Sequence, residues 1–377
     1  MKIIRLELFH IVIPFAKPYH LSQAYGTLCE AHAVILKVHT DESIVGFGEA
    51  DPMNPFTDET PATVMVVLRD AVAPCIIGRD PTRAALLETE LDRRVQGNPT
   101  ARGAVNMALF DIMGKAKGVP AHAMLGGLQH VELPILWGIS NGTPAEDAAA
   151  IEELMQLGCR TVMIKMGAFP ISEEIKRMAA ARERFEDKLH FIADANQGWD
   201  LSQATAFIDG IRGFPPDLIE QPVRHWNIDG LKRVRDRSPC PLSADESLVS
   251  PHDAAALILA QAVDVFSLKV SKNGGLYKCK QIAQAAEVFG IKCLMNSMLE
   301  FGITQAASLQ VGCTLTNLLP MGHAYGSVVR MADDVTDFGC NVSGATVRVP
   351  AGSGLGVSIV EDKLKKYTRD YLEIKAH

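Results

Sequence analysis

The second half of this sequence repeats one pattern, and the repeat limits the folds that the chain can adopt. From residue 131 onward, short runs of β-forming residues alternate with amphipathic stretches typical of helices, and each run ends in a polar or charged residue. Five of these final residues are separated by 29, 26, 25 and 24 residues, and they are Lys165, Asp194, Glu220, Asp245 and Lys269. Strands that alternate with helices are typical of parallel βαβ units. Even spacing over seven or eight units favours a closed α/β barrel over an open sheet.

The first 127 residues follow a different order, in which strands come first and helices follow. Periodicity predicts strands at 2–14, 33–39 and 43–48, and helices at 61–77, 83–95 and 101–117. This order is typical of an α+β domain. Strand-like character returns from about residue 342. We therefore expect an α+β domain of residues 1–127, completed by about 342–377, and a barrel of residues 128–341.

Charge and hydropathy exclude several kinds of partner. The net charge is −7 and no basic run is present, so we expect binding neither to nucleic acid nor to an anionic membrane. No apolar stretch approaches the roughly 18 residues that a membrane span needs. Arg5 and Glu7 interrupt the first apolar run, which argues against a signal peptide. We expect a cytoplasmic protein that acts on a small molecule and forms a homo-oligomer.

The charged residues at the predicted strand ends indicate a metal site. The carboxyl ends of barrel strands converge on one pocket, so Asp194, Glu220 and Asp245 should point into the same mouth. Three neighbouring carboxylates repel one another, and a divalent cation relieves that repulsion. Ligation by oxygen alone favours Mg²⁺, with Mn²⁺ as a substitute. The sequence therefore predicts a magnesium site at the barrel mouth.

Two lysines flank the three carboxylates and indicate the reaction. Lys165 lies one unit before the carboxylates and Lys269 one unit after them, so the two amines should stand on opposite sides of a bound substrate. Removing the proton next to a substrate carboxylate gives an enolate, and the metal can stabilise its negative charge. We expect nearby positive charge to lower the pKa of both lysines toward neutrality. A lone Asp after a strand is usually a helix cap, but five such residues in register are hard to explain that way.

Motifs along nearly the whole chain resemble those of the enolase superfamily, and within it the muconate lactonizing enzyme subgroup. They are, in order, GFGEA (46–50), ALFDIMGKAKGVPAHAMLGG (108–127), IKMG, ADANQGW, IEQP, SADES, LKVSKNGG and MLEFGIT. The resemblance implies a modified (β/α)₇β TIM-like barrel with an α+β capping domain made from both chain ends. It also implies abstraction of a proton α to a carboxylate. By motif, it makes Asp194, Glu220 and Asp245 the Mg²⁺ ligands and Lys165 and Lys269 the acid/base pair.

One position departs from the subgroup's pattern. The subgroup commonly has K-x-K on the second barrel strand, whereas Met163 takes the first of these positions, two residues before Lys165. Without that ammonium, the pKa of Lys165 should be less depressed. Some subgroup members that act on amino-acid and proline derivatives also lack this lysine, which favours racemisation or epimerisation of such a substrate. The alternatives are dehydration of a hydroxyproline-type acid, muconate-type cycloisomerisation and a catalytically silent binding barrel.

Five further residues are candidates for substrate contacts. By the resemblance, segments 19–26 and 51–56 close over the barrel and set specificity, and the first of them contains Tyr25. The other four candidates lie near the predicted strand ends, where a side chain can either contact the substrate or have a supporting or structural role. The candidates there are Asn196, which we expect to support the metal ligands, Ser297, Glu300, with a structural carboxylate as its alternative, and His323, with a core histidine as its alternative.

Overall fold

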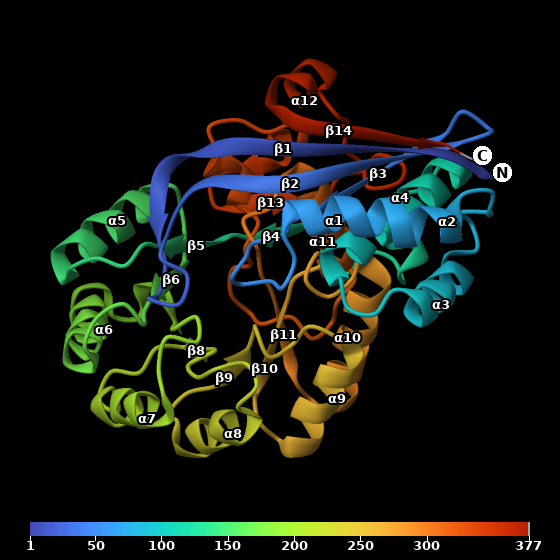
Figure 1. Ribbon diagram of the computed structural model, residues 1–377. Helices are drawn as coiled ribbons and strands as arrows, with labels where there is room; N and C mark the ends of the chain where they lie inside the picture. The colour runs from blue at the N-terminus through green and yellow to red at the C-terminus, as the bar shows by residue number, and fades with distance from the viewer. Residues whose placement is uncertain (376–377) are drawn as a thin grey trace.

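The computed structural model describes residues 1–375 and has two parts, an antiparallel sheet with its helices and a β/α barrel (Figure 1). The sheet has the strand order β14-β1-β2-β3. Its strands are β1 (Ile3–His20), β2 (Thr27–Thr40), β3 (Val45–Ala50) and β14 (Thr368–Lys375). Thus the last strand of the chain completes the first sheet, as expected.

Strand β1 shows how the alternation of apolar residues relates to the pairing register. Leu6 and Leu8 are fully buried, and further along the strand Ile11 and Ile13 are fully buried instead. The extra residue at the shift between His10 and Ile11 lies in β14, whereas β1 stays in register with β2 from Arg5 to Pro14. Because successive side chains point to opposite faces, the first half of β1 buries one face of the strand and the second half also buries the other.

The helices of the first part confirm the predicted order. They are α1 (Pro61–Val67), a π-helical stretch (Leu68–Val72), α2 (Ala73–Ile76), α3 (Ala84–Arg94) and α4 (Pro99–Lys117). Helix α4 begins at a proline and is followed by Gly118, whose φ of 67° lies in the left-handed region that favours glycine. It lies directly against β3, where a side chain at Gly46 or Gly48 would overlap the backbone of α4.

The barrel consists of seven parallel strands in sequence order, closed by an irregular eighth segment. The strands are β5 (Leu136–Ile139), β6 (Thr161–Lys165), β7 (His190–Asp194), β8 (Leu218–Glu220), β9 (Leu242–Ala244), β10 (Val265–Leu268) and β11 (Lys292–Met295). The eighth segment bridges both edges of this sheet, because Leu318 pairs with Cys293 of β11 and His323 pairs with Ile135 just before β5. The predicted α/β barrel with an α+β domain is therefore confirmed.

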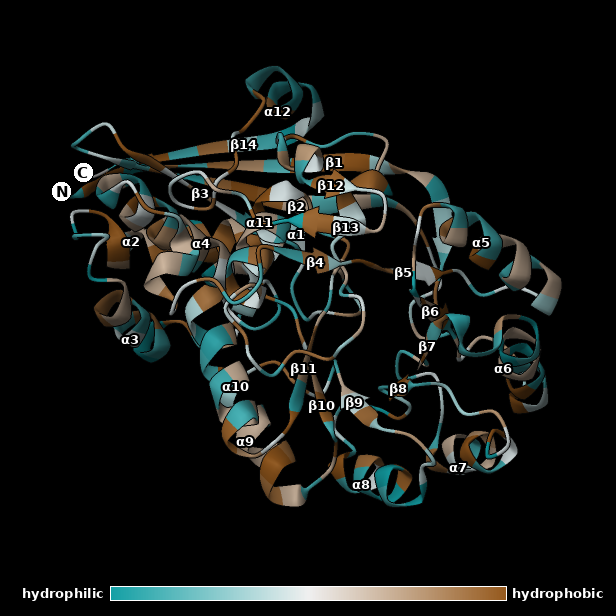
Figure 2. Ribbon diagram, turned by 180° about the vertical axis from the view of Figure 1, so that it is seen from behind, coloured by the Kyte–Doolittle hydropathy of each residue, from teal (hydrophilic) through white to brown (hydrophobic). Residues whose placement is uncertain are grey.

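Helices surround the barrel and present both hydrophilic and hydrophobic residues along their lengths (Figure 2). They are α5 (Pro144–Gln156), α6 (Ile171–Phe185), α7 (Leu201–Gly210), α8 (Ile228–Arg237), α9 (Pro251–Ala260), α10 (Leu276–Val288) and α11 (Gly302–Gly312). Three of them begin with a reciprocal capping box, at Thr143, Asp200 and Ser250. No helix within residues 1–375 is long and apolar enough to cross a membrane.

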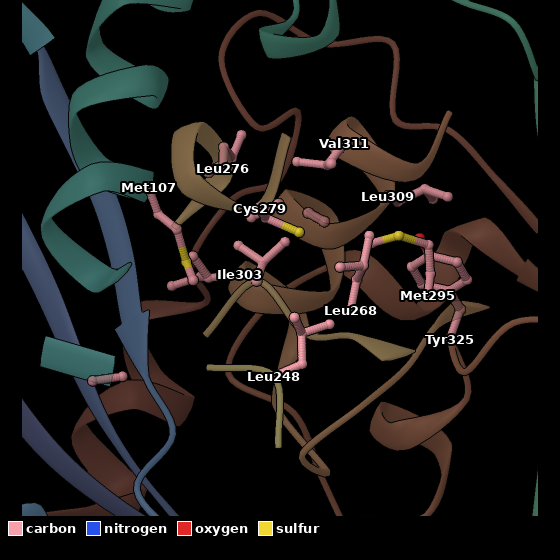
Figure 3. Close-up of a cluster of buried hydrophobic side chains, with 14 of the residues drawn as sticks. Met107, Leu248, Leu268, Leu276, Cys279, Met295, Ile303, Leu309, Val311 and Tyr325 are labelled. Carbon is pink, nitrogen blue, oxygen red and sulfur yellow. The ribbon is translucent and has the colours of Figure 1, made fainter. Parts of the chain in front are cut away.

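Two hydrophobic clusters hold the barrel in place. The larger one joins the two parts of the molecule, because Met107 of α4 packs in the same cluster as Leu268, Leu276 and Ile303 of the barrel (Figure 3). The smaller one fills the barrel interior with one residue from each of six strands: Leu136, Met163, Ile192, Leu218, Val265 and Leu294. Since side chains alternate along a strand, the residues two positions later also face inward, one layer nearer the mouth.

The C-terminal segment differs in part from the expectation that residues 342–377 all rejoin the first domain. Strands β12 (Val342–Ser343) and β13 (Thr346–Arg348) instead form a small sheet with β4 (Glu132–Pro134), next to the barrel. The chain then rejoins the first part at Gly354, which bridges to Pro120, and after α12 (Glu361–Tyr367) it pairs with β1 through β14. Alternating residues predict a strand, but they do not identify the strand with which it pairs. Residues 376 and 377 lie outside the described part.

Candidate active site

Three carboxylates occupy the inward layer above the apolar barrel interior. Register pairs Asp194 of β7 with Glu220 of β8, and Asp245 follows β9 directly. Their exposed fractions are 1%, 0% and 1%. Burial raises the pKa of Glu220 well above its usual value, and repulsion from Asp194 and Asp245 adds to that effect. The predicted convergence of the three acids is thus present, and it is close enough for their charges to interact.

Amines and an amide contact these carboxylates. Lys165 forms an ion pair with Asp194. Lys269 donates from Nζ to Oδ2 of Asp245 at 2.6 Å, and Lys272 donates to Oδ1 of the same residue at 2.7 Å. Nδ2 of Asn296 donates to Oε1 of Glu220 at 2.8 Å.

The pKa values of the two lysines differ from the expectation. Burial lowers the pKa of each amine, but the facing carboxylates outweigh burial and raise the pKa of both. The largest opposing effect comes from Asp194 on Lys165 and from Asp245 on Lys269. The expectation of a lowered pKa is therefore wrong for the protein's own charges. That expectation considered the positive charge of a bound metal ion, but not the ion pairs that each lysine forms with these carboxylates.

The oxygen atoms of the three carboxylates are the kind of donor that a hard divalent cation prefers, although the carboxylates are arranged here to pair with lysines. Within residues 1–375, no group of three His, Cys, Asp or Glu side chains is arranged to hold a metal ion, since lysine ammoniums occupy the carboxylate oxygens. Two more acceptors, Oδ1 of Asn196 and Oε2 of Glu246, are buried without a hydrogen-bond partner. Buried acceptors without donors are costly, and a hydrated cation would satisfy them. Oxygen donors of this kind suit Mg²⁺ or Mn²⁺.

A cavity of about 60 Å³ lies at the barrel mouth. Lys165 and Lys269 both line it, from strands β6 and β10, which stand on either side of the three carboxylate-bearing strands. The first domain covers it with residues of the two segments that were expected to close the barrel: Tyr19, Leu21, Tyr25, Met53 and Phe56. Both amines therefore line one cavity, from strands on either side of the carboxylates, as the spacing of the motifs predicted.

The remaining candidate residues divide into those that line the cavity and those that do not. Asn196, Ser297 and Tyr25 line it. The Tyr25 hydroxyl donates to Oε1 of Glu246 at 3.0 Å, which ties the covering segment to the barrel. Asn196 donates its backbone N–H to Oδ1 of Asp194 at 2.9 Å and so orients one of the three carboxylates.

Glu300 and His323 lie behind the cavity wall. Glu300 is 1% exposed, accepts a hydrogen bond from the Ser297 hydroxyl, and has a pKa that burial raises to about 7. Nδ1 of His323 accepts the backbone N–H of Met295 at 3.1 Å, and burial lowers the pKa of its ring to about 3. The candidate role of His323 as a substrate contact is therefore wrong, since this neutral ring is a structural part of the eighth segment.

Sequence reasoning missed several side chains of the site. Asn296 ends the seventh strand run, so the rule that found the carboxylates could have found it too. Lys272 follows Lys269 by three residues, and only the turn after β10 brings it back to Asp245. The ring of Phe56 lies 4.2 Å from Nζ of Lys269, a contact between distant segments that no local pattern signals.

Comparison with known families agrees with this geometry. The family model for the mandelate racemase / muconate lactonizing enzyme N-terminal domain matches residues 3–126, and the model for enolase C-terminal domain-like proteins matches residues 146–363. The chain belongs to the mandelate racemase / muconate lactonizing enzyme family. The predicted resemblance is thus confirmed, and the chain is an enzyme of the enolase superfamily.

Named relatives in this family are about 30% identical to the chain along nearly its full length. The chain is 30% identical to the N-succinyl-L-Arg/Lys racemase of Bacillus cereus, with 98% of each chain covered. It is 30% identical to the L-Ala-D/L-Glu epimerase of Bacillus subtilis (95% and 97% covered) and 31% identical to a chloromuconate cycloisomerase of Cupriavidus necator (98% and 100% covered). The crystal structure of the Bacillus cereus racemase superposes with a TM-score of 0.95 at 28% identity and full coverage of both chains.

Proposed function

We propose that this enzyme removes the proton α to the carboxylate of a small molecule and returns a proton to the opposite face, so that it racemises or epimerises an amino-acid or proline derivative. One observation carries the proposal: Lys165 and Lys269 line the same cavity from opposite sides of the carboxylates. Inversion at a carbon needs a base on one face and an acid on the other, and two amines provide both.

The remaining residues support this assignment through charge. Asp194, Glu220 and Asp245 would hold Mg²⁺ or Mn²⁺, which when bound supplies positive charge for the oxygens of the substrate carboxylate. Lys165 and Lys269 hold the protons that are exchanged with the α-carbon, and the ring of Phe56 contacts the ammonium of Lys269 at 4.2 Å. The covering segment excludes water through Tyr25 and its hydrogen bond to Glu246.

Met163 favours racemisation over the muconate-type alternative. Its side chain is 3% exposed and lines the cavity together with Lys165, at the position where the subgroup's K-x-K pattern has a second lysine. Two relatives named above are a racemase and an epimerase of amino-acid derivatives, whereas a third is a chloromuconate cycloisomerase. Dehydration and cycloisomerisation use the same proton abstraction and are outcomes of the test below. A cytoplasmic location and a homo-oligomeric state stay predictions from the sequence.

The test follows proton exchange by ¹H NMR in D₂O on a set of N-acylated amino acids, dipeptides, proline derivatives and hydroxy acids. The wild type should convert one enantiomer into the α-deuterated other enantiomer. Lys165→Ala and Lys269→Ala should each abolish inversion, while each still exchanges the α-proton of one enantiomer through the lysine that is left. An unsaturated or cyclised product without inversion would refute the racemase and keep the proton abstraction. Exchange that neither substitution affects would refute both.

Metal dependence needs a separate measurement. EDTA should abolish exchange and Mg²⁺ or Mn²⁺ should restore it. By titration calorimetry, Asp194→Asn, Glu220→Gln and Asp245→Asn should each weaken Mg²⁺ binding, because each removes a full charge from the oxygen donors. Asp209→Asn is the matched control, since that acid pairs with Arg237 on the outer helices. Unchanged Mg²⁺ affinity in the three site variants would contradict the metal assignment.

A further inference from the structure

One wall of the cavity carries a basic side chain that the proton chemistry does not use. Arg330 follows the eighth barrel segment and lines the cavity. Its backbone is attached to strand β1, because the N–H of Ala16 donates to the carbonyl of Arg330 at 2.9 Å and the N–H of Ala332 donates to the carbonyl of Pro14 at 2.9 Å. The position of Arg330 is thus set by the junction between the two parts of the molecule.

Aromatic rings and two glycines hold the guanidinium group of Arg330. Its central carbon lies 4.8 Å from the ring centroid of Tyr19 and 5.5 Å from that of Trp137. One of its nitrogens donates to the carbonyl of Gly138. A side chain at Gly138 would overlap the Tyr19 hydroxyl, and a Cβ at Gly326 would lie 2.9 Å from the Trp137 ring. Both glycines therefore leave the space in which this wall is assembled.

Hydrogen-bond donors of this wall lack acceptors. Among the residues that the structure describes, Arg330 has no salt bridge. Its guanidinium group has five N–H bonds, and one of its nitrogens donates to the Gly138 carbonyl, its one protein acceptor among these residues. Trp137 is 9% exposed, and its indole N–H is buried without a partner. A buried donor without an acceptor is costly, so the two side chains together favour an acceptor that arrives from outside.

The charges and the position of the wall indicate what that acceptor is. Three charged side chains line the cavity, Lys165, Lys269 and Arg330, and all three are cations. Tyr19, Trp137, Gly138 and Arg330 also line a second cavity of about 390 Å³ that reaches α5, so the wall stands where a longer substrate would extend away from the lysines.

We propose that Arg330 and the indole N–H of Trp137 bind a second carboxylate of the substrate, at the end remote from the reacting carbon. The inference rests on the proposed function and narrows its substrate class to amino-acid derivatives with a distal carboxylate, in an acyl group or a side chain. A planar guanidinium group donates hydrogen bonds to both oxygens of a carboxylate at once, and its place between two rings keeps it oriented before the substrate arrives.

The test compares two compounds that differ only at the distal end, N-succinyl-L-alanine and its neutral amide analogue, N-succinamoyl-L-alanine. Titration calorimetry of the enzyme with saturating Mg²⁺ should show at least about tenfold tighter binding of the succinyl compound, equivalent to about 1.4 kcal/mol. Arg330→Met should abolish this preference and leave the affinity for the amide within about twofold. Arg330→Lys should retain part of the preference, and Trp137→Phe should reduce it.

Arg233→Met is the matched control, because this arginine lies on α8 with 66% of its side chain exposed, and it should keep the full preference. Equal binding of the two compounds by the wild type, including no binding of either, would overturn the subsite, as would an unchanged preference in Arg330→Met. Preferential binding without α-proton exchange of either compound would leave the subsite standing and count against racemisation of N-acyl amino acids.

Discussion

Lys165 and Lys269 should contribute unequally to stability. Asp194 is 1% exposed, and Lys165 is its single ion-pair partner among residues 1–375. Asp245 is equally buried but pairs with both Lys269 and Lys272. Lys165→Met therefore leaves a buried carboxylate without a cation, whereas Lys269→Met leaves one cation in place.

The magnitude follows from these contacts. Breaking a buried ion pair from one side costs roughly 3–5 kcal/mol. We therefore expect Lys165→Met to lower the free energy of unfolding by about 3–5 kcal/mol. Lys269→Met should lower it by about 1–2 kcal/mol, which includes the loss of its contact with Phe56.

Urea unfolding followed by circular dichroism, with EDTA and then with excess Mg²⁺, measures both values. Added Mg²⁺ should reduce the difference between the two variants to under about 1 kcal/mol, because a cation bound by the carboxylates replaces the missing ammonium. Lys176→Met is the control, since this lysine is 65% exposed and should show no measurable change. Equal losses for the two site variants, or a difference that Mg²⁺ leaves unaltered, would refute this electrostatic reasoning.

Three further substitutions test neighbouring parts of the site. Met163→Lys should shift the rate optimum to lower pH, because a second ammonium lowers the pKa of Lys165, and coincident pH profiles of the two active proteins would contradict this. Glu300 has a pKa of about 7 in the folded state and an ordinary value of 4.5 in the unfolded state. The free energy of unfolding of the wild type should therefore fall by roughly 3 kcal/mol between pH 4.5 and pH 7, relative to that of Glu300→Gln. Urea unfolding at several pH values measures this difference. Gly138→Ala should raise KM by displacing the Tyr19 hydroxyl, and adding Tyr19→Phe should restore KM; a double variant as impaired as the single one would count against that contact.

In the barrel, periodicity and spacing were enough to predict which strand-end side chains lie together. Strand-end residues at even intervals predicted which side chains converge, because parallel strands with helical crossovers must present their carboxyl ends at one mouth. Asp194, Glu220 and Asp245 do meet there, and Lys165 and Lys269 do stand on either side of them. These are properties of one repeating local unit, so one sequence is enough to find them.

Contacts between distant segments needed the tertiary structure. Local alternation predicted a strand near Val347, but not its partner: this strand pairs with β4 and not with the first sheet. His323 lies near a strand end like the proposed catalytic residues, yet its ring faces the core. The wall around Arg330 joins Tyr19 with residues more than a hundred positions away. Sequence alone thus determined what repeats along the chain, whereas long-range packing decided partners and directions, because the energies that select them arise only once the two parts of the molecule are in contact.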